Sequence, residues 1–292
     1  MSEKILGYIE NDTIIHRLSG TTKLIYFLML SIIVMTSYDT RFLLFVTIFS
    51  LILFKLAEIP WEAVSFVVKF VLVFAILNLL AIYIFEPEYG VNLYNSRTII
   101  RDGWGRYSLT KEQLFYELNV AIKYFSTIPL ALIFIFTTSP SEFASSLNKI
   151  GVSYKISYAV ALALRYIPDI QESYNDIKLA SQARGIEMSK KASLIDRIKS
   201  SSNIVWPLIL DSLNRIETIS QAMELRRFGK ENSRTWYSYR PFRKIDIFAI
   251  VISALITAVG VYLFFVNGGR FYNPFIGWSS IDLKICKSIN FC

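Results

Sequence analysis

The sequence has very little of what most metal and catalytic sites require. It contains one histidine, His16, and two cysteines, Cys286 and Cys292, which both lie among the last seven of its 292 residues. This set cannot supply the Cys and His ligands of a zinc site, and a lone histidine in the N-terminal arm offers no Ser-His-Asp triad. No Gly-x-x-x-x-Gly-Lys-Ser/Thr loop is present. We therefore expect the chain to bind no cofactor or metal and to hydrolyse no ATP.

Charge is also scarce. Charged residues make up 18% of the chain and hydrophobic residues 53%, whereas an ordinary soluble domain has about 25% charged residues. Glycine (12) and proline (8) are too few for a disordered or collagen-like chain. The composition therefore predicts an all-α, polytopic membrane protein.

Five apolar runs approach the roughly 20 residues that a helix needs to cross the hydrocarbon core of a bilayer. The first two are short and are separated by Asp39 and Arg41, so we interpret them as a tight hairpin whose helices extend into flanking Thr and Lys residues. Lys69, Lys123 and Asp246 lie toward the ends of their runs, where a charged side chain can reach the headgroups. The predicted spans are Leu24–Tyr38, Phe42–Ala57, Val64–Phe85, Val120–Thr137 and Ile245–Phe265.

The net charge of +8 is concentrated in one segment. Residues 138–244 hold 17 of the 31 Lys and Arg and 10 of the 23 Asp and Glu, a net charge of +7, whereas residues 86–117 hold four basic and five acidic residues. Positive loops stay on the cytoplasmic side of a membrane. We therefore expect the N-terminus and residues 138–244 in the cytoplasm, and residues 86–117 and the C-terminus outside. The predicted organisation is a four-span bundle (1–137), a cytoplasmic module (138–244), a final span (245–266) and an extracellular tail (267–292).

The cytoplasmic module contains two long helical patterns, Ser153–Ala183 and Asp196–Phe228. Apolar residues recur in the first at spacings of three and four, as in an amphipathic helix, and the second repeats its design. Each pattern contains one proline, Pro168 or Pro207. These prolines suit hinges that bend as partners move, and they equally suit ordinary kinks without a mechanical role.

Each helical pattern also ends in an arginine, Arg184 or Arg226, shortly after a Ser-Gln-Ala tripeptide. A guanidinium presents a rigid fork of donors that suits carboxylates, which makes it a good anchor at a protein interface. The same arginine also complements the negative end of a helix dipole, worth about 0.3–1 kcal/mol. Spacing alone does not decide between these two interpretations.

Four motifs in this region occur in an order and spacing that resemble one known family. They are Thr137-Thr138-Ser139-Pro140, Ala163-Leu164-Arg165-Tyr166-Ile167-Pro168, Gln182-Ala183-Arg184-Gly185 and Ala222-Met223-Glu224-Leu225-Arg226-Arg227-Phe228. The chain resembles the transmembrane T component of energy-coupling factor transporters, the EcfT or CbiQ-type family. The resemblance covers about Leu18 to Phe265 and is strongest from Thr137 to Gly229.

The resemblance implies a coupling subunit in a prokaryotic cell membrane. In this family two coupling helices, each ending in an Ala-Arg-Gly-like motif, hold two ABC-type ATPases, which bind ATP and Mg. The membrane part holds a small substrate-binding S component that delivers a vitamin or a transition-metal ion. Ala183-Arg184-Gly185 matches the first motif completely, whereas Leu225-Arg226-Arg227 keeps the arginine and replaces both small neighbours. Arg227 is then either an added contact or a solvated side chain.

Other functions fit the sequence less well. A stand-alone channel or secondary transporter needs ionisable residues near the middle of the membrane or paired broken helices, and the apolar runs offer neither clearly. A membrane-embedded enzyme lacks a convergent set of acid, base or metal ligands. Nucleic acid is excluded as a partner, because the basic residues of 138–244 are interspersed with ten acidic residues on helices tied to the membrane.

Overall fold

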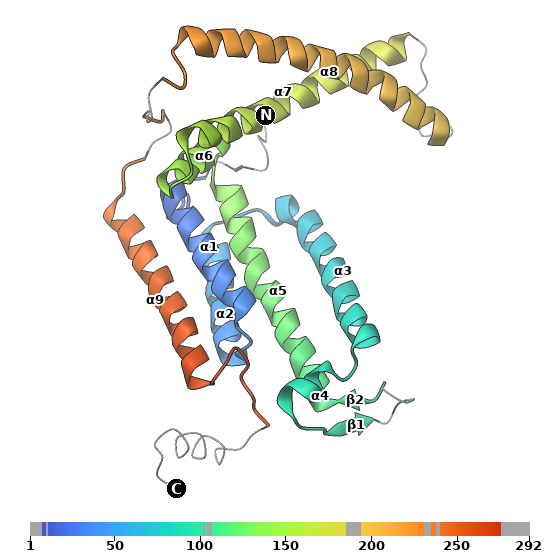
Figure 1. The fold of residues 1–292 in the computed structure, drawn as a ribbon, viewed down its shortest axis with the longest axis vertical. Coiled ribbons are helices and arrows are strands. Elements are labelled where there is room, and N and C mark those ends of the chain that lie inside the picture. The colour runs from blue at the N-terminus through green and yellow to red at the C-terminus, as the bar shows by residue number, and fades with distance from the viewer. Residues whose placement is uncertain are drawn as a thin grey trace. The chain divides into compact units, whose positions relative to one another are not determined.

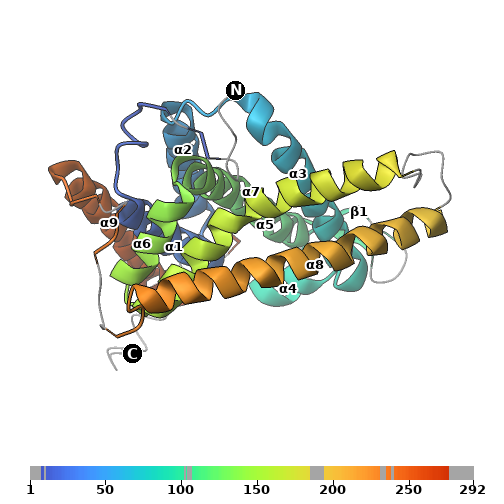
Figure 2. The same cartoon turned by 90° about the horizontal axis from the view of Figure 1, so that it is seen from above.

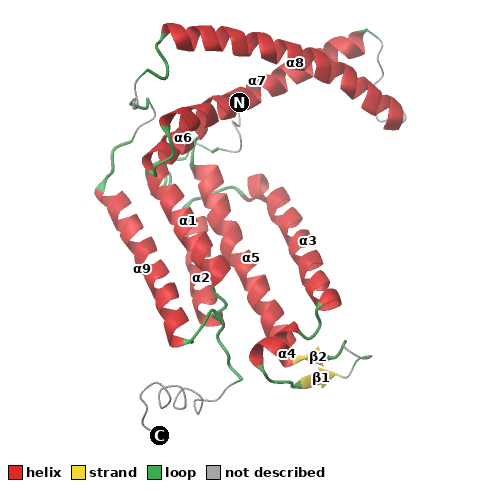
Figure 3. Cartoon of the chain, in the orientation of Figure 1, coloured by secondary structure: helices red, strands yellow, loops and turns green. Residues whose placement is uncertain are grey.

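The computed structural model describes residues 8–9, 11–101, 103, 107–184, 194–230, 235–237 and 240–275, and for residues 194–201 and 203 it describes the backbone only. The described chain is mostly helical, as Figure 3 shows, with one short two-stranded sheet. It divides into two units. We call residues 9–137 together with the chain from Phe242 onward the membrane unit, and residues 138–241 the insert unit.

The described part of the membrane unit contains five long helices, whose arrangement Figure 1 shows. Three of them, α3, α5 and α9, are long and apolar enough to cross a membrane, whereas α1 and α2 have 17 residues each. At about 1.5 Å per residue these two are roughly 25 Å long, somewhat shorter than the hydrocarbon core. The all-α membrane fold predicted from composition is confirmed. The helices are α1 (Gly20–Thr36), α2 (Thr40–Leu56), α3 (Trp61–Phe85), α5 (Lys111–Thr137) and α9 (Lys244–Val266).

Side-chain caps set the start of the first two helices. The Ser19 hydroxyl accepts a hydrogen bond from the Thr22 N–H, and the Asp39 carboxylate accepts one from the Arg41 N–H. Both caps satisfy amides that have no partner inside a helix. The predicted extension of the first helix into flanking residues is confirmed, because α1 begins at Gly20.

The core of the membrane unit lies around α5. Helix α2 packs along α5, and α1 packs against both α5 and α9. Buried apolar side chains form two clusters, and α9 adds Ile256 to the one between α1, α2 and α5. Helix α3 leaves most of its apolar surface exposed, as suits a helix that faces lipid. The cluster that includes Ile256 comprises Leu30, Ile33, Val34, Phe42, Leu43, Val46, Leu130 and Ile256.

Helix α5 begins nine residues earlier than the predicted span. The chain before it forms α4 (Tyr89–Tyr94) and the antiparallel strands β1 (Ile99–Arg101) and β2 (Leu109–Thr110). The first turn of α5 then binds this connection: the buried carboxylate of Glu112 accepts hydrogen bonds from the Thr98 N–H (3.0 Å) and the Ser96 hydroxyl (2.9 Å). Glu112, which the predicted span left outside the helix, thus belongs to α5 and holds the preceding connection against it.

Residues 267–275 pack against the membrane unit. Asn267 donates a hydrogen bond to the Asp39 carboxylate (2.8 Å), and the Phe271 ring stacks on Tyr38 with centroids 4.5 Å apart. Although burial would raise the pKa of the Asp39 carboxyl, hydrogen bonds from Arg41 and Asn267 lower it below its ordinary value. The turn between α1 and α2 is therefore tied to the chain that follows α9.

The insert unit contains three helices, α6 (Pro140–Lys149), α7 (Tyr154–Ala183) and α8 (Leu194–Leu225). Ser139 caps α6 by accepting from the Glu142 N–H, and Pro140 occupies the first helical turn, where a missing N–H does no harm. Helices α7 and α8 contact each other; their ribbons cross in Figure 1 and lie beside each other in Figure 2. The predicted helices Ser153–Ala183 and Asp196–Phe228 agree with α7 and α8 to within a few residues at their ends.

Candidate functional site

The first predicted arginine, Arg184, lies at the C-terminal end of α7. Ala183 is the last helical residue, and the Arg184 N–H closes the helix by donating to the carbonyl of Ala180 (3.2 Å). Ala183 and Arg184 are both exposed. Gly185, the third residue of the motif, lies outside the described residues.

The second predicted arginine, Arg226, immediately follows the last residue of α8, Leu225. The Phe228 N–H donates to the carbonyl of Met223 (2.9 Å), and the Arg227 N–H donates to that of Glu224 (2.9 Å). This pair of hydrogen bonds is the Schellman helix end, in which one residue adopts a left-handed backbone. That residue is Arg227, with φ 56°. It occupies the place of the motif's glycine.

Leu225 replaces the motif's alanine without disturbing the helix end. Its side chain is 86% exposed, so it projects away from the unit and makes no close packing around Arg226. Arg226 and Arg227 are exposed as well. The two large residues beside Arg226 therefore leave its guanidinium accessible.

An aromatic cluster holds the end of α8 against the start of α7. The Phe228 ring lies 4.7 Å from Tyr158 and 5.5 Å from Tyr154, and Trp236 lies 5.9 Å from Tyr154. Trp236 also donates its indole N–H to the side-chain oxygen of Asn148 (3.2 Å). Aromatic pairs at these separations add about 0.5–1.5 kcal/mol beyond the area they bury. The position of Arg226 is thus fixed by contacts of the residues that follow it in the chain.

Helices α7 and α8 run in opposite directions, so their terminal arginines lie at opposite ends of the pair. Arg215 in α8 donates to the Ser173 hydroxyl near the middle of α7 (3.0 Å), whereas Phe228 contacts Tyr158 near its start. From Tyr158 to Arg184 the helix rises about 40 Å at 1.5 Å per residue. The insert unit therefore presents two separated arginine ends rather than one composite site.

The two predicted hinge residues lie within continuous helices. Pro168 is inside α7 and Pro207 is inside α8. Each proline lacks the N–H that would bond to the carbonyl four residues earlier, so each helix is locally weaker there. A hinge role for either residue stays a prediction.

Lys123 and Asp246, which the sequence analysis placed toward the headgroups, are among the buried charged residues of the membrane unit. Lys123 is 6% exposed, donates to the carbonyl of Met35 in the last turn of α1 (2.8 Å) and lies 3.1 Å from the centre of the Tyr38 ring. A cation there complements the negative end of the α1 dipole. Because α5 begins at Lys111, Lys123 lies well inside the helix and not near its end.

Asp246 is also buried, with 1% of its surface exposed. Its carboxylate accepts hydrogen bonds from the N–H groups of Ser19 (2.7 Å) and Arg243 (2.8 Å) and from the Thr22 hydroxyl (2.9 Å). Asp246 therefore joins the start of α9 to the start of α1 and does not reach toward the headgroups.

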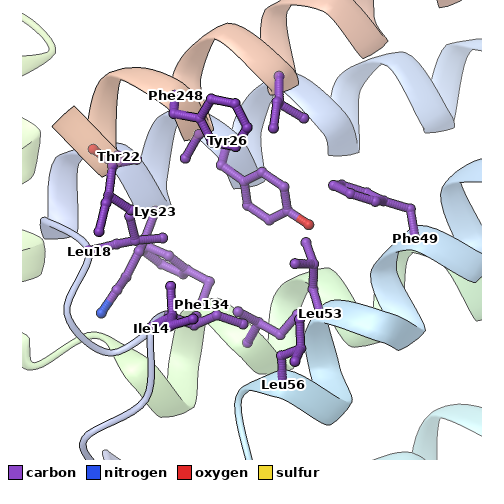
Figure 4. A pocket seen from close by; sticks show the side chains of 15 residues that line it. Ile14, Leu18, Thr22, Lys23, Tyr26, Phe49, Leu53, Leu56, Phe134 and Phe248 are labelled. Atoms are coloured by element: carbon purple, nitrogen blue, oxygen red, sulfur yellow. The ribbon is translucent and has the colours of Figure 1, made fainter.

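An apolar cavity of about 240 Å³ lies among α1, α2, α5 and α9, near the starts of α1 and α9 and the end of α2 (Figure 4). The Tyr26 ring extends into it between Phe49 and Leu53, and the Tyr26 hydroxyl has no hydrogen-bond partner among the described residues. A cavity with this lining suits hydrocarbon, since a buried water needs several polar partners. No group of three His, Cys, Asp or Glu residues that could hold a metal ion occurs within the described parts of the chain.

Comparison with known proteins now adds to this geometry. Residues 11–237 match the family described as cobalt transport protein, CbiQ. The chain belongs to the CbiQ family. This match covers the membrane helices up to α5 and the whole α6–α8 insert, including both arginine ends.

Relatives of this CbiQ chain share a single description, energy-coupling factor transporter transmembrane protein EcfT. The protein of Streptococcus equi subsp. equi (strain 4047) is 30% identical over 90% of this chain and 97% of its own length. Those of Ruminiclostridium cellulolyticum and Streptococcus thermophilus are 25% and 26% identical over 85% and 91% of this chain. The resemblance seen in the motifs is confirmed: this is a multi-pass transmembrane component of an energy-coupling factor transporter.

Proposed function

We propose that this chain is the coupling subunit through which two cytoplasmic ABC-type ATPases drive a small substrate-binding S component that imports a vitamin or a transition-metal ion. ATP and Mg are bound by the ATPases, and this chain takes no part in the chemistry. The observation that carries the proposal is the pair of exposed arginines, Arg184 and Arg226, at opposite ends of the packed α7–α8 pair. Their separation of about 40 Å along α7 provides two docking positions on one pair of contacting helices.

Each ATPase docks on one arginine end through acidic side chains. The guanidinium fork of Arg184 or Arg226 forms paired hydrogen bonds to a carboxylate. In the sequence the first arginine has small neighbours, Ala183 and Gly185, whereas the backbone of Arg227 completes the turn beside the second. Approach of the two ATPases then moves the two ends of the α7–α8 pair, and Pro168 and Pro207 act as the hinges.

Charge reversal at the two ends tests this assignment. Arg184→Glu and Arg226→Glu, singly and together, are purified with the ATPases and the S component. Glu172→Arg serves as the control charge reversal, because Glu172 is exposed in the interior of α7 and lies away from both ends. We expect each single variant to weaken ATPase association and the double variant to lose ATP-dependent uptake. Normal uptake by a complete complex of the double variant would refute the assignment of these arginines.

The alternative, a stand-alone channel or secondary transporter, is tested in the same preparation. The chain reconstituted alone into vesicles is expected to move no substrate with or without an ion gradient. Uptake by the isolated chain at the rate of the full complex would make it a self-contained transporter.

The proposed orientation has the N-terminus and the insert unit in the cytoplasm and the C-terminus outside. It is tested in a chain whose two native cysteines are replaced by serine. A cysteine at exposed Ser220 in α8 is expected to resist a membrane-impermeant thiol reagent in whole cells, and one at exposed Asn95 after α4 is expected to react. The opposite labelling pattern would reverse the orientation.

A further inference from the structure

The wall of the apolar cavity in the membrane unit is continuous with the surface that faces lipid. Ile245 and Phe248 near the start of α9 and Leu56 at the end of α2 line the cavity, and each of these side chains is at least half exposed. Helix α9 packs on α1 and α2 packs on α5, whereas α2 and α9 make little direct contact with each other. The bilayer that covers these helices therefore has access to the cavity between them.

The size and lining of this cavity suit a hydrocarbon chain. An apolar cavity of about 150 Å³ is large enough to stay dry and bind benzene. The cavity here has about 240 Å³. Lipid tails are as apolar as a leucine side chain, so the acyl chains of the surrounding bilayer are the hydrocarbon that is at hand to fill it.

One polar group inside the cavity has no partner. The Tyr26 hydroxyl is buried and makes no hydrogen bond to the described residues, and Figure 4 shows it pointing into the space between Phe49 and Leu53. A buried tyrosine hydroxyl ordinarily has a partner, and the hydrocarbon core holds no water to provide one. The hydroxyl therefore matches a ligand that carries a hydrogen-bond acceptor beside its hydrocarbon.

The other polar side chains of the lining are already paired. Lys23 donates to the backbone carbonyls of His16 and Thr137, and the Thr22 hydroxyl donates to the Asp246 carboxylate. A phosphate group inside the cavity would lose its hydration without gaining a new donor, which is costly. An ester carbonyl is a neutral acceptor and needs only the Tyr26 hydroxyl.

Tyr26 also lies at a suitable depth in the membrane. It is six positions after Gly20, the first residue of α1, which corresponds to about 9 Å at 1.5 Å per residue. In a hydrocarbon core about 30 Å thick this is the outer third, the part nearest the ester groups of the lipids. Helices as short as α1 and α2 thin the bilayer around them, which brings those ester groups closer to the hydroxyl.

We propose that this cavity binds one acyl chain of a membrane glycerophospholipid, with the Tyr26 hydroxyl donating a hydrogen bond to the ester carbonyl at the head of that chain. The phosphate headgroup stays outside the cavity, at the membrane surface. The bound chain fills the space between α2 and α9 and so joins two helices that make little contact themselves. This inference goes beyond the proposed function, because it depends on the membrane unit alone.

A variant that fills the cavity tests the site. Ala249 lines the cavity, and Ala258 is exposed on the same helix outside the lining, so Ala249→Phe and Ala258→Phe form a matched pair. The full chain is purified in detergent, and native mass spectrometry follows the binding of dioleoyl-phosphatidylcholine in a titration. We expect one tightly bound lipid in the wild type and in Ala258→Phe, and a Kd at least about 10-fold higher in Ala249→Phe, the effect of excluding two methylene groups.

An ether-linked phosphatidylcholine with the same chains tests the partner of Tyr26, because it lacks the ester carbonyl. The wild type is expected to bind the ester lipid about 3- to 10-fold more tightly than the ether lipid, the range for one net hydrogen bond. Tyr26→Phe keeps the ring and removes the hydroxyl, so it is expected to bind both lipids equally. Equal binding of the two lipids by the wild type would show that the carbonyl is not the partner of Tyr26 and would overturn the proposal.

A labelling experiment on the wild type needs no variant and decides the case in which Ala249→Phe does not fold. The chain is reconstituted into phosphatidylcholine vesicles that contain a phospholipid with a diazirine on one acyl chain, and the labelled residues are identified by mass spectrometry after illumination. We expect labels on Phe49 and Leu53, which line the cavity and are only partly exposed. Labels confined to fully exposed residues, such as those of α3, would contradict the site.

Two other results would also overturn it. If Ala249→Phe holds its lipid as tightly as Ala258→Phe does, the bound lipid lies elsewhere. If the wild type loses its lipid when the S component is present, and Ala249→Phe weakens association with the S component, that subunit occupies the cavity instead. Neither result bears on Arg184 and Arg226, whose test is the binding of the ATPases.

Discussion

The left-handed backbone at Arg227 predicts that a glycine there stabilises the end of α8. Arg227 has φ 56°, and its N–H and that of Phe228 close the Schellman hydrogen bonds to Glu224 and Met223. A side chain with a Cβ is strained in this conformation, whereas glycine adopts it freely. Arg227→Gly therefore removes strain from the folded state without removing either hydrogen bond.

The size of the effect follows from two opposing contributions. The left-handed conformation costs a residue other than glycine about 1–2 kcal/mol. Glycine loses about 0.4–1 kcal/mol more backbone entropy on folding. The difference favours Arg227→Gly by about 1 kcal/mol, which corresponds to a fivefold change in a local opening equilibrium, at about 1.4 kcal/mol per factor of ten.

Hydrogen exchange measures this opening directly, because the amides of Arg227 and Phe228 exchange only when the helix end opens. We expect their exchange to slow about fivefold in Arg227→Gly. Arg227→Ala keeps the strained backbone and removes the charge, so it is expected to leave exchange unchanged. Glu58, at the end of α2 with φ 50°, provides a matched position where glycine should act in the same direction. Equal effects of Arg227→Gly and Arg227→Ala would refute the reasoning, since the side chain rather than the backbone would then govern the opening.

Three further predictions concern the membrane unit in detergent. Burial and the nearby charge of Lys23 lower the pKa of His16. As the pH drops, the unfolded chain therefore protonates its histidine before the folded chain does, and thermal stability is expected to fall as the pH passes the ordinary histidine value of about 6.5. Since His16 is the one histidine of the sequence, His16→Gln should remove that dependence, and an unchanged pH profile of the variant would contradict the prediction. Asp246→Ala removes the acceptor of three hydrogen bonds, two of them buried, and is expected to lower the free energy of unfolding by about 3 kcal/mol in a denaturant titration. A loss below about 0.5 kcal/mol would show that the contact between the starts of α9 and α1 is unimportant. At Gly260 an added Cβ would lie 2.5 Å from the Ile33 side chain. Gly260→Ala is therefore expected to lower the free energy of unfolding by about 1–3 kcal/mol, although alanine has a better helix propensity than glycine. A higher melting temperature of the variant would disprove this close approach.

Periodicity and length were sufficient to predict the long helices. The apolar runs of α3 and α9 leave no alternative to a membrane helix, and the spacing of three and four in α7 can be satisfied only by a helix. The positions of Arg184 and Arg226 at the ends of α7 and α8 could be predicted because the signals lie close together in the sequence. They are a Ser-Gln-Ala tripeptide, the arginine itself and a following glycine, or the residue that replaces it. Local chemistry is what a single sequence records most directly.

Contacts between distant segments could not be predicted in this way. The early start of α5 depends on Glu112 being satisfied by Thr98, and the burial of Lys123 depends on the last turn of α1 lying beside α5. A polar residue in such a place looks like a loop residue or a headgroup contact until its partner is known. The packing of residues 267–275 on Tyr38 is of the same kind, since no pattern in the tail itself indicates it.

The departure of Leu225-Arg226-Arg227 from an Ala-Arg-Gly motif is best explained by function rather than by folding. The turn requires only a left-handed residue after Arg226, and glycine would provide it with less strain than Arg227 does. Backbone strain that persists in a native protein is often associated with a functional site. What Arg227 supplies and glycine does not is another exposed guanidinium beside Arg226.

This difference predicts that stability and docking respond in opposite directions. Arg227→Gly is expected to protect the end of α8 and yet to weaken ATPase binding by up to about fivefold, the range for an exposed ion pair worth about 0.2–1 kcal/mol. Because exposed charges are screened by salt, the loss should disappear at about 1 M ionic strength. Arg227→Lys keeps the charge and the strain and should bind like the wild type. Undiminished ATPase binding by Arg227→Gly at low salt would mean that the arginine at this position has no role in docking. Docking would then not explain why the strained residue is an arginine.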